Sequence, residues 1–505
     1  MNRRWKILLA LALFLAMAAA SGLLSLHFQP GNELDTYKRL LRDQGEKLTL
    51  AEVLPAPAAT EENSANSLQD AAALFSTAAD NSSAMQMVGP GRAEIGWTQP
   101  DVRGYDFTNS WEQYRAYVEA DRPAVELLRQ ILDRPRLDFQ LDYSLGAKLP
   151  LPHLATMKRA AQKLVVATQL DLHDGDTAAA ATNLLTMLAI VQRDHRDDLI
   201  IGHLVRVAIT AVAVPPTWEF LQATNATDEQ MAAVQNGWEQ LNFLKDAENV
   251  FATERAWVSG EIEKYRASHE NFKELAGGAM AMSGSLSGGP SGWESLTERP
   301  RYAVAEVMWR SSWSYSQELE IIKQNQAILE ALRTMQTNHG QFYKADYDAM
   351  ETRLSSIGGT NLSGPLFHAL EIPDFHDDFS SSLGGAIRKT LQIETARRLV
   401  VTAIALKRFQ SKHGKFPETL AGLSPEFLPA MPMDPNDGKP LKYRPDGDGT
   451  FLLYSVGEDG TDDGGDAGGS SSKLGSWYWL RARDWVWPQP ATPAEVQFYN
   501  EHPPK

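Results

Sequence analysis

The chain has 505 residues, enough for two or three domains, and a formal net charge of −16. This acidic balance argues against sequence-independent binding of nucleic acid, because such binding needs a basic surface that displaces counterions. Cysteine is absent, which excludes disulfides, iron–sulfur clusters, thiolate catalysis and a lipid anchor on cysteine. The fold must therefore depend on its apolar core.

The N-terminus predicts a membrane segment. Arg3, Arg4 and Lys6 precede an apolar stretch over residues 7–28, which is long enough to cross a bilayer as a helix. The positive flank places the N-terminus in the cytoplasm and the remaining chain outside. Three alanines before Ser21 also suit a cleaved signal peptide, but the apolar character continues past this point and favours an anchor. Under both readings the body of the chain is extracytoplasmic, at the inner membrane if the segment is retained.

The middle of the chain is predicted to be helical. Residues 29–110 read as a linker or spacer with a short helix near 67–79, and residues 111–383 as a helical domain of hairpins or a bundle. Residues 277–292 are rich in Gly, Ser and Met and predict a flexible loop. Apolar residues recur at helical spacing over residues 111–132, 154–172, 177–192, 199–221, 228–265 and 301–339.

Histidine and aspartate residues in this helical part suggest an alternative function. His153, His173, Asp174 and His195 imitate the histidine–aspartate pattern of metal-dependent phosphohydrolases, in which such ligands converge from several helices. A turn at Gly175 explains the same residues without catalysis, and we assign no catalytic residue here. A metal-dependent hydrolase nevertheless remains the alternative to a binding or structural protein.

The C-terminal part predicts a small α+β domain over residues 384–488, followed by a tail at 489–505. Apolar residues over 396–409 form one helix face, with Lys407 expected on a solvated face, and Gly414 with Pro417 ends the helix. Short apolar runs then predict an antiparallel sheet packed on that helix, with strands at 441–444, 451–455 and 477–480 and a hairpin at 446–449.

An acidic loop follows the second predicted strand. Several carboxylates and glycines crowd together there, and one further carboxylate precedes the end of the domain: Asp459, Asp462, Asp463, Asp466 and Asp484. Like charges this close repel one another unless solvent or a cation separates them, and calcium takes six to eight oxygen ligands of this type. These five residues are our candidate calcium ligands. A solvated acidic turn is the other interpretation.

Three motifs in this region resemble the globular domain of the major pseudopilin of type II secretion. They are Gly414-Lys415-Phe416-Pro417, the Asp434-Pro435 segment with Gly438, and Tyr454-Ser455-Val456-Gly457 followed by Asp459-Gly460. The resemblance covers residues 395–487. It implies a long helix on a short antiparallel sheet and a calcium-holding loop, in which Asp459 and Asp484 match the most diagnostic carboxylate positions.

The chain also departs from that family. A Gly/Ser insertion at 467–473 leaves open which of Asp462, Asp463 and Asp466 is a ligand. The N-terminus lacks the Gly-Phe processing site and the Glu of pseudopilins, and more than three hundred residues separate it from the C-terminal module. The sequence therefore predicts a membrane-attached binding or structural protein with unknown protein partners, associated with secretion or envelope assembly. A divergent pseudopilin-type subunit is a further alternative.

Overall fold

The computed structural model describes residues 30–76, 84–104, 108–193, 199–273, 303, 306–337, 344–357, 376–447, 449–468 and 482–502. These residues are mostly helical with small sheets, which confirms the predicted mainly α class. The predicted membrane segment, the Gly/Ser-rich loop at 277–292 and the strand at 477–480 lie outside the described residues. The chain divides into two compact units, one of residues 1–54, 251–330 and 349–384, the other of residues 55–250, 331–348 and 385–505.

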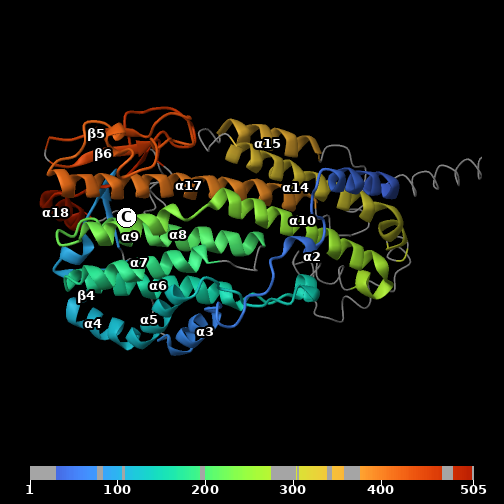
Figure 1. The fold of residues 1–505 in the computed structure, drawn as a ribbon, viewed down its shortest axis with the longest axis horizontal. Coiled ribbons are helices and arrows are strands. Elements are labelled where there is room, and N and C mark those ends of the chain that lie inside the picture. Colours follow the sequence, from blue (N-terminus) through green and yellow to red (C-terminus); the bar gives the residue numbers. More distant parts are fainter. Residues whose placement is uncertain are drawn as a thin grey trace, which may run out of the picture. The chain divides into compact units, whose positions relative to one another are not determined.

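Four helices in the larger unit match the predicted periodicity. Three of them lie side by side, and the fourth packs on α7 (Figure 1): α6 (Pro152–His173), α7 (Thr177–Gln192), α8 (Ile200–Phe220) and α9 (Asp228–Glu239). The turn from α6 to α7 contains Gly175 at φ +79°, and Asp176 caps α7 by accepting the Ala179 amide at 2.9 Å. The predicted helical hairpin is therefore present.

Two predicted helices are each divided into shorter pieces. Residues 111–132 form α4 (Trp111–Ala120), α5 (Arg122–Arg129) and a short 3-10 turn, η2 (Gln130–Asp133). The break falls at Asp121, which accepts the Ser76 amide at 2.7 Å and pairs with Lys163 of α6 at 2.7 Å. Residues 228–265 likewise divide into α9 and α10 (Phe243–Ala267). Pro123 at the start of α5 accounts for the first break, because proline lacks the amide that would continue α4, and the contacts of Asp121 fix its position.

The C-terminal helix is longer than predicted. α17 runs over His376–His413, so it includes residues 376–395, which the sequence did not place in the helix. Buried apolar side chains such as Leu383 and Ile387 explain the extension, because tertiary packing outweighs the low helix propensity of Gly384 and Gly385. Two helices precede α17 in the chain, α14 (Ser314–Thr337) and α15 (Lys344–Ile357). The last turns of α14 and the first turn of α15 belong to the larger unit.

An antiparallel sheet follows α17, and its first two strands lie where the sequence predicts them. The third strand, at 485–486, was not predicted. The strand order of the sheet is β5 (Lys442–Pro445), β6 (Phe451–Ser455) and β7 (Trp485–Val486), preceded by a 3-10 turn, η5 (Leu420–Leu423). The hairpin at 446–449 is closed by the Asp446 amide, which donates to the Thr450 carbonyl at 2.9 Å. Gly449, at φ +84°, supplies the left-handed conformation that this turn requires.

The sheet and α17 share one apolar core with the helices of the same unit. Buried residues from α3 (Ala65–Leu74) through α9 form one cluster with Leu399, Phe416 and Trp485. The indole of Trp218 in α8 donates to the Pro488 carbonyl at 2.7 Å, and both groups are buried. The domain boundary predicted at residue 384 stays a prediction, but a chain cut there would lose these buried partners.

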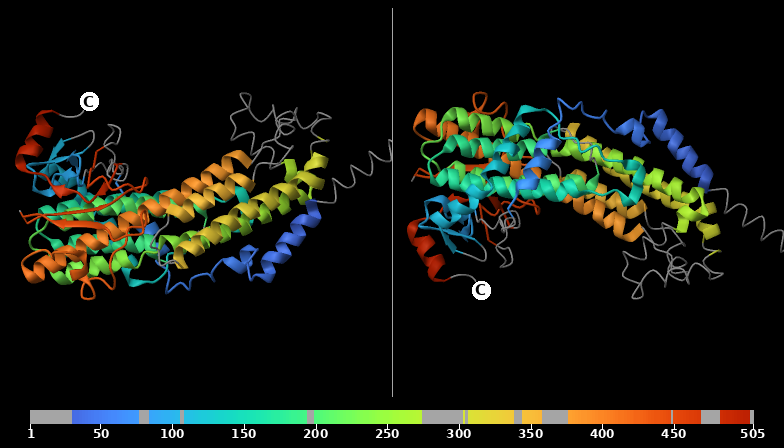
Figure 2. Two further views of the ribbon diagram at one scale, coloured as in Figure 1. Left: turned by 90° about the horizontal axis from the view of Figure 1, so that it is seen from above. Right: turned by 90° about the horizontal axis from the view of Figure 1, so that it is seen from below.

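Segments predicted as spacer and tail pair with each other. β1 (Met87–Gly89) is antiparallel to β2 (Arg92–Ala93), and β2 pairs in parallel with β8 (Gln489–Pro490). α18 (Pro493–Glu501) lies beside these strands (Figure 2). Arg92 also pairs with Glu495 at 3.1 Å. After β2 the chain forms η1 (Gly96–Thr98) and then the antiparallel pair of β3 (Asp101–Arg103) and β4 (Thr108–Ser110).

The smaller unit is helical and contains a buried polar network. Residues 30–43 are helical and pack through Leu34 and Leu41 on α14, and a short helix, α2 (Leu50–Val53), follows. Glu318 of α14 is fully buried and binds Lys38, Arg266 at 2.5 Å and Ser259 at 2.7 Å. α14 is preceded by a π-helical turn, η4 (Trp309–Trp313). Charges buried in this way need partners, because an unpaired ion in the interior is costly.

Within the described part of the chain one helix, α8, is long and apolar enough to cross a membrane. It is 67% buried inside the protein and packs against α6 and α7. Core helices commonly have this composition.

Glu219, near the end of α8, anchors the segment that contains β1 and η1. Its Oε1 accepts the amides of Met85 and Gly96, each at 2.9 Å, and its side chain is 1% exposed. Burial raises the pKa of Glu219 to about 8 from 4.5. The folded protein therefore holds a proton on Glu219 that the unfolded chain releases above about pH 4.5.

Glu219→Gln should stabilise the protein at neutral pH. Between about pH 4.5 and 8 only the unfolded chain loses the proton, so the stability of the wild-type protein falls as pH rises. Glutamine keeps the accepting oxygen without titrating, and the expected gain at pH 7 is about 3 kcal/mol, vanishing below about pH 4.5. Urea unfolding at pH 4 and pH 7 measures both values. Glu229→Gln, at an exposed position of α9, is the control, and an equal midpoint for Glu219→Gln and wild type at pH 7 contradicts the argument.

Candidate functional site

Asp434 joins two of the motifs that resemble pseudopilins. Its buried carboxylate accepts the hydroxyl of Ser455 at 2.9 Å, the amide of Val456 at 2.8 Å and the amide of Asn436 at 3.0 Å. Burial raises the pKa of Asp434. The Asp-Pro segment and the Tyr-Ser-x-Gly segment therefore meet at one side chain, to which the sequence reasoning assigned no role.

Asp484 holds the acidic loop between β6 and β7. Its carboxylate is fully buried and accepts the backbone amides of Gly465 at 2.7 Å and Asp466 at 3.1 Å, with the Asp463 amide more distant at 3.5 Å. Burial raises the pKa of this carboxyl. The loop is thus folded around one carboxylate, which satisfies amides that would otherwise lack acceptors.

Of the other four candidate ligands, Asp459, Asp462 and Asp466 make side-chain contacts in or beside the loop. Asp459 accepts the Thr461 amide at 2.9 Å, and Asp462 accepts the Tyr454 hydroxyl at 2.9 Å. Asp466 pairs with Arg483 at 3.0 Å. Asp459, Asp462 and Asp463 are exposed, whereas Asp466 is partly exposed. Their negative charge is therefore largely left to solvent.

Whether this loop can coordinate a calcium ion depends on which atoms surround the Asp484 carboxylate. Calcium requires converging oxygen atoms, whereas Asp484 meets amide hydrogens, which a cation would have to displace. Across the described residues no three carboxylate or histidine side chains are grouped so as to hold a metal ion. Calcium binding by Asp459, Asp462, Asp463, Asp466 and Asp484 stays a prediction.

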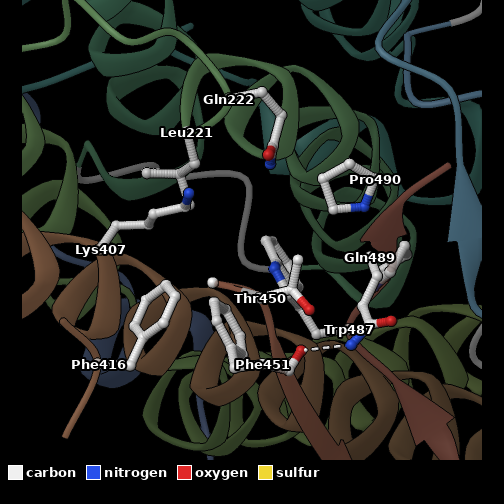
Figure 3. Close-up of a pocket in the computed structure, with 11 residues that line it drawn as sticks. Leu221, Gln222, Lys407, Phe416, Thr450, Phe451, Trp487, Gln489 and Pro490 are labelled. Atoms are coloured by element: carbon white, nitrogen blue, oxygen red, sulfur yellow. Dashed lines mark hydrogen bonds between the residues drawn. The ribbon is translucent and has the colours of Figure 1, made fainter. Parts of the chain in front are cut away.

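A small pocket lies where the sheet meets the ends of α8 and α17 (Figure 3). It encloses about 40 Å³. The side chains of Lys407, Phe416 and Phe451 line one side, and Leu221 and Pro490 lie across from Phe451. The rings of Phe416 and Phe451 are 5.0 Å apart and nearly perpendicular, at 72°. No local sequence pattern indicates this pocket, because its residues come from four distant segments.

Lys407 is the charged group of the pocket. It is predicted on a solvated face, and the structure shows its side chain only partly exposed, with its Nζ 5.9 Å from the centroid of the Phe416 ring. Burial lowers the pKa of Lys407. Its ammonium group is thus attracted by an aromatic face while it is withdrawn from water.

Two histidines of the alternative hydrolase, His153 and His173, do not share a site. His153 stacks on Phe139 with ring centroids 4.4 Å apart, and His173 stacks on Trp111 at 3.6 Å. These two histidines lie at opposite ends of α6, about 30 Å apart at the usual rise of a helix. His195 lies outside the described residues.

Comparison with known proteins identifies no relative. The chain matches no protein-family model, no curated protein and no solved structure. The likeness to pseudopilins therefore depends on the motif residues alone.

Gly457 should be far less tolerant of alanine than Gly414. Both have positive φ, +70° and +73°, which costs alanine about 1–2 kcal/mol. A Cβ at Gly457 would also lie 2.5 Å from the Arg483 carbonyl, whereas a Cβ at Gly414 meets nothing within 4 Å. Gly457→Ala should lower the free energy of unfolding by at least about 1 kcal/mol more than Gly414→Ala. Urea unfolding compares the two, and equal losses would show that the loop readily adopts another path.

Proposed function

We propose that this chain is a membrane-attached, extracytoplasmic binding or structural protein with a pseudopilin-like C-terminal module. One observation supports the proposal most directly. α17 leads into the antiparallel sheet β5–β6–β7, and the acidic loop between β6 and β7 is folded on Asp484. This is the order of elements that the motif resemblance implies.

A binding or structural role is favoured over the alternative hydrolase. The histidine–aspartate pattern was the main sequence argument for an enzyme, and its His153 and His173 are separated by the length of α6. Asp174, the one aspartate of that pattern among the described residues, pairs with Arg115. His153, His173 and Asp174 are thus used in stacking and an ion pair.

An envelope or secretion-associated role is favoured over a pilus subunit. A pseudopilin packs its N-terminal helix directly below its globular domain, whereas here the apolar segment at 7–28 is separated from the module by more than three hundred residues. The module also shares its core with α3 to α9. We therefore expect protein partners in the cell envelope rather than polymerisation into a pilus.

A reporter fusion tests the location. A reporter enzyme that is active only outside the cytoplasm, fused after Lys505, should be active because the positive charges at Arg3, Arg4 and Lys6 keep the N-terminus inside. Carbonate washing should leave the protein in the membrane fraction. Release of a soluble form beginning near Ser21 would select the signal peptide, and an inactive fusion would contradict an extracytoplasmic location.

A thermal unfolding experiment tests calcium. If the acidic loop binds the ion, the full chain should melt a few degrees higher in millimolar calcium than in chelator, since hundredfold excess over Kd adds about 2.7 kcal/mol. Magnesium should act more weakly because it retains its waters. Asp459→Ala should remove the shift, and Glu418→Ala, at an exposed carboxylate outside the loop, should keep it. If the protein melts at the same temperature in calcium and in chelator, the loop does not bind calcium. The contacts of Asp484 with backbone amides then hold the loop without an ion.

A further inference from the structure

The pocket beside β6 combines apolar walls with a cation. Phe416, Phe451 and Trp487 are at most 8% exposed, so the walls are fixed by the core of the unit. Lys407 directly follows the fully buried Leu406 in α17, and its own side chain is partly exposed. Lys407 therefore lies at the edge of that core. Figure 3 shows Lys407 beside Phe416 and directed toward Leu221 and the interior of the pocket.

Lys407 has no acidic partner among the described residues, unlike Lys163 and Lys412 of the same unit. Lys163 is fully buried and pairs with Asp121 at 2.7 Å. Lys412, five residues further along α17, pairs with Glu426 although it is exposed. A partly buried ammonium group without a counter-ion is costly, and only a weak contact with Phe416 offsets this cost. An anion in the pocket would supply the missing partner.

The size of the pocket restricts that anion. A cavity needs about 10–15 Å³ in this measure for each water molecule, so about 40 Å³ encloses about three or four non-hydrogen atoms. Any further atom of a ligand, such as the fifth of propionate, must lie in the mouth of the pocket. A single ammonium group suits a monovalent carboxylate better than a phosphate, which calls for several donors. The aromatic walls favour an aliphatic group next to the carboxylate.

We propose that this pocket binds a short aliphatic carboxylate, with Lys407 holding the carboxylate and Phe416, Phe451 and Trp487 enclosing the carbon chain. The ligand is either a free short-chain acid or the carboxylate end of a larger molecule that extends through the mouth of the pocket. The site is independent of the acidic loop and of the proposed pseudopilin-like function. It makes the protein a receptor for a small organic anion.

Propionate and propionamide test the proposal on the full chain. They have the same shape, but only propionate is charged at neutral pH. Saturation-transfer NMR of the ligand should show saturable binding of propionate and binding of propionamide that is weaker by about tenfold or more, as a charge-assisted hydrogen bond predicts. Equal binding of the two, or no saturable binding of propionate, would overturn the proposal.

Two lysine variants assign the binding to Lys407. Lys407→Met keeps the length and apolar stem of the side chain, and should weaken propionate binding by about tenfold or more. Lys412→Met removes a neighbouring charge of the same helix outside the pocket and should leave binding unchanged. If Lys407→Met binds propionate as the wild type does, the site lies elsewhere and the proposal is wrong. If Lys407→Met fails to fold, the comparison of propionate with propionamide on the wild-type chain still tests whether the pocket binds a carboxylate.

Discussion

The packing of α17 and the sheet on α8 is the constraint on which the larger unit depends. The buried hydrogen bond from the Trp218 indole to the Pro488 carbonyl joins the C-terminal end of α8 to the chain just after β7. Around it, apolar side chains of the helices and the sheet form one core. This packing closes the walls of the Lys407 pocket and places β8 beside β2. A helical part and an α+β part thus share one interior.

Buried carboxylates organise the irregular segments of this unit. Glu219, Asp434 and Asp484 are each at most 1% exposed, and each accepts backbone amides. Burial raises the pKa of all three, so each carboxylate position binds protons more tightly in the folded chain. Amides in loops need acceptors when water is excluded, and a carboxylate serves two or three at once. The acidic residues that resemble a metal site therefore also have a structural use.

The helices were predictable because their apolar residues recur over many turns. The ranges of α6, α7 and α8 agree with the periodicity to within two residues at each end. The motifs at Gly449 and Asp446 likewise predicted the hairpin of β5 and β6 from local turn chemistry. By contrast, β2 and β8 are two residues each and pair across about four hundred positions, so no local pattern marks them. Lys407 illustrates the same limit, because the rings that surround it come from segments distant from its helix.

The sequence by itself determined the helical class, the absence of disulfides, the apolar N-terminal segment and the acidic loop with its five aspartates. Each of these follows from composition or from patterns within a few turns of chain. Only the tertiary structure decided that Asp484 faces amide hydrogens, that Glu219 accepts the amides of Met85 and Gly96, and that Lys407 borders an aromatic pocket. These properties depend on which distant segments pack together, and the free energy of that packing is a sum over contacts that no single stretch of sequence contains.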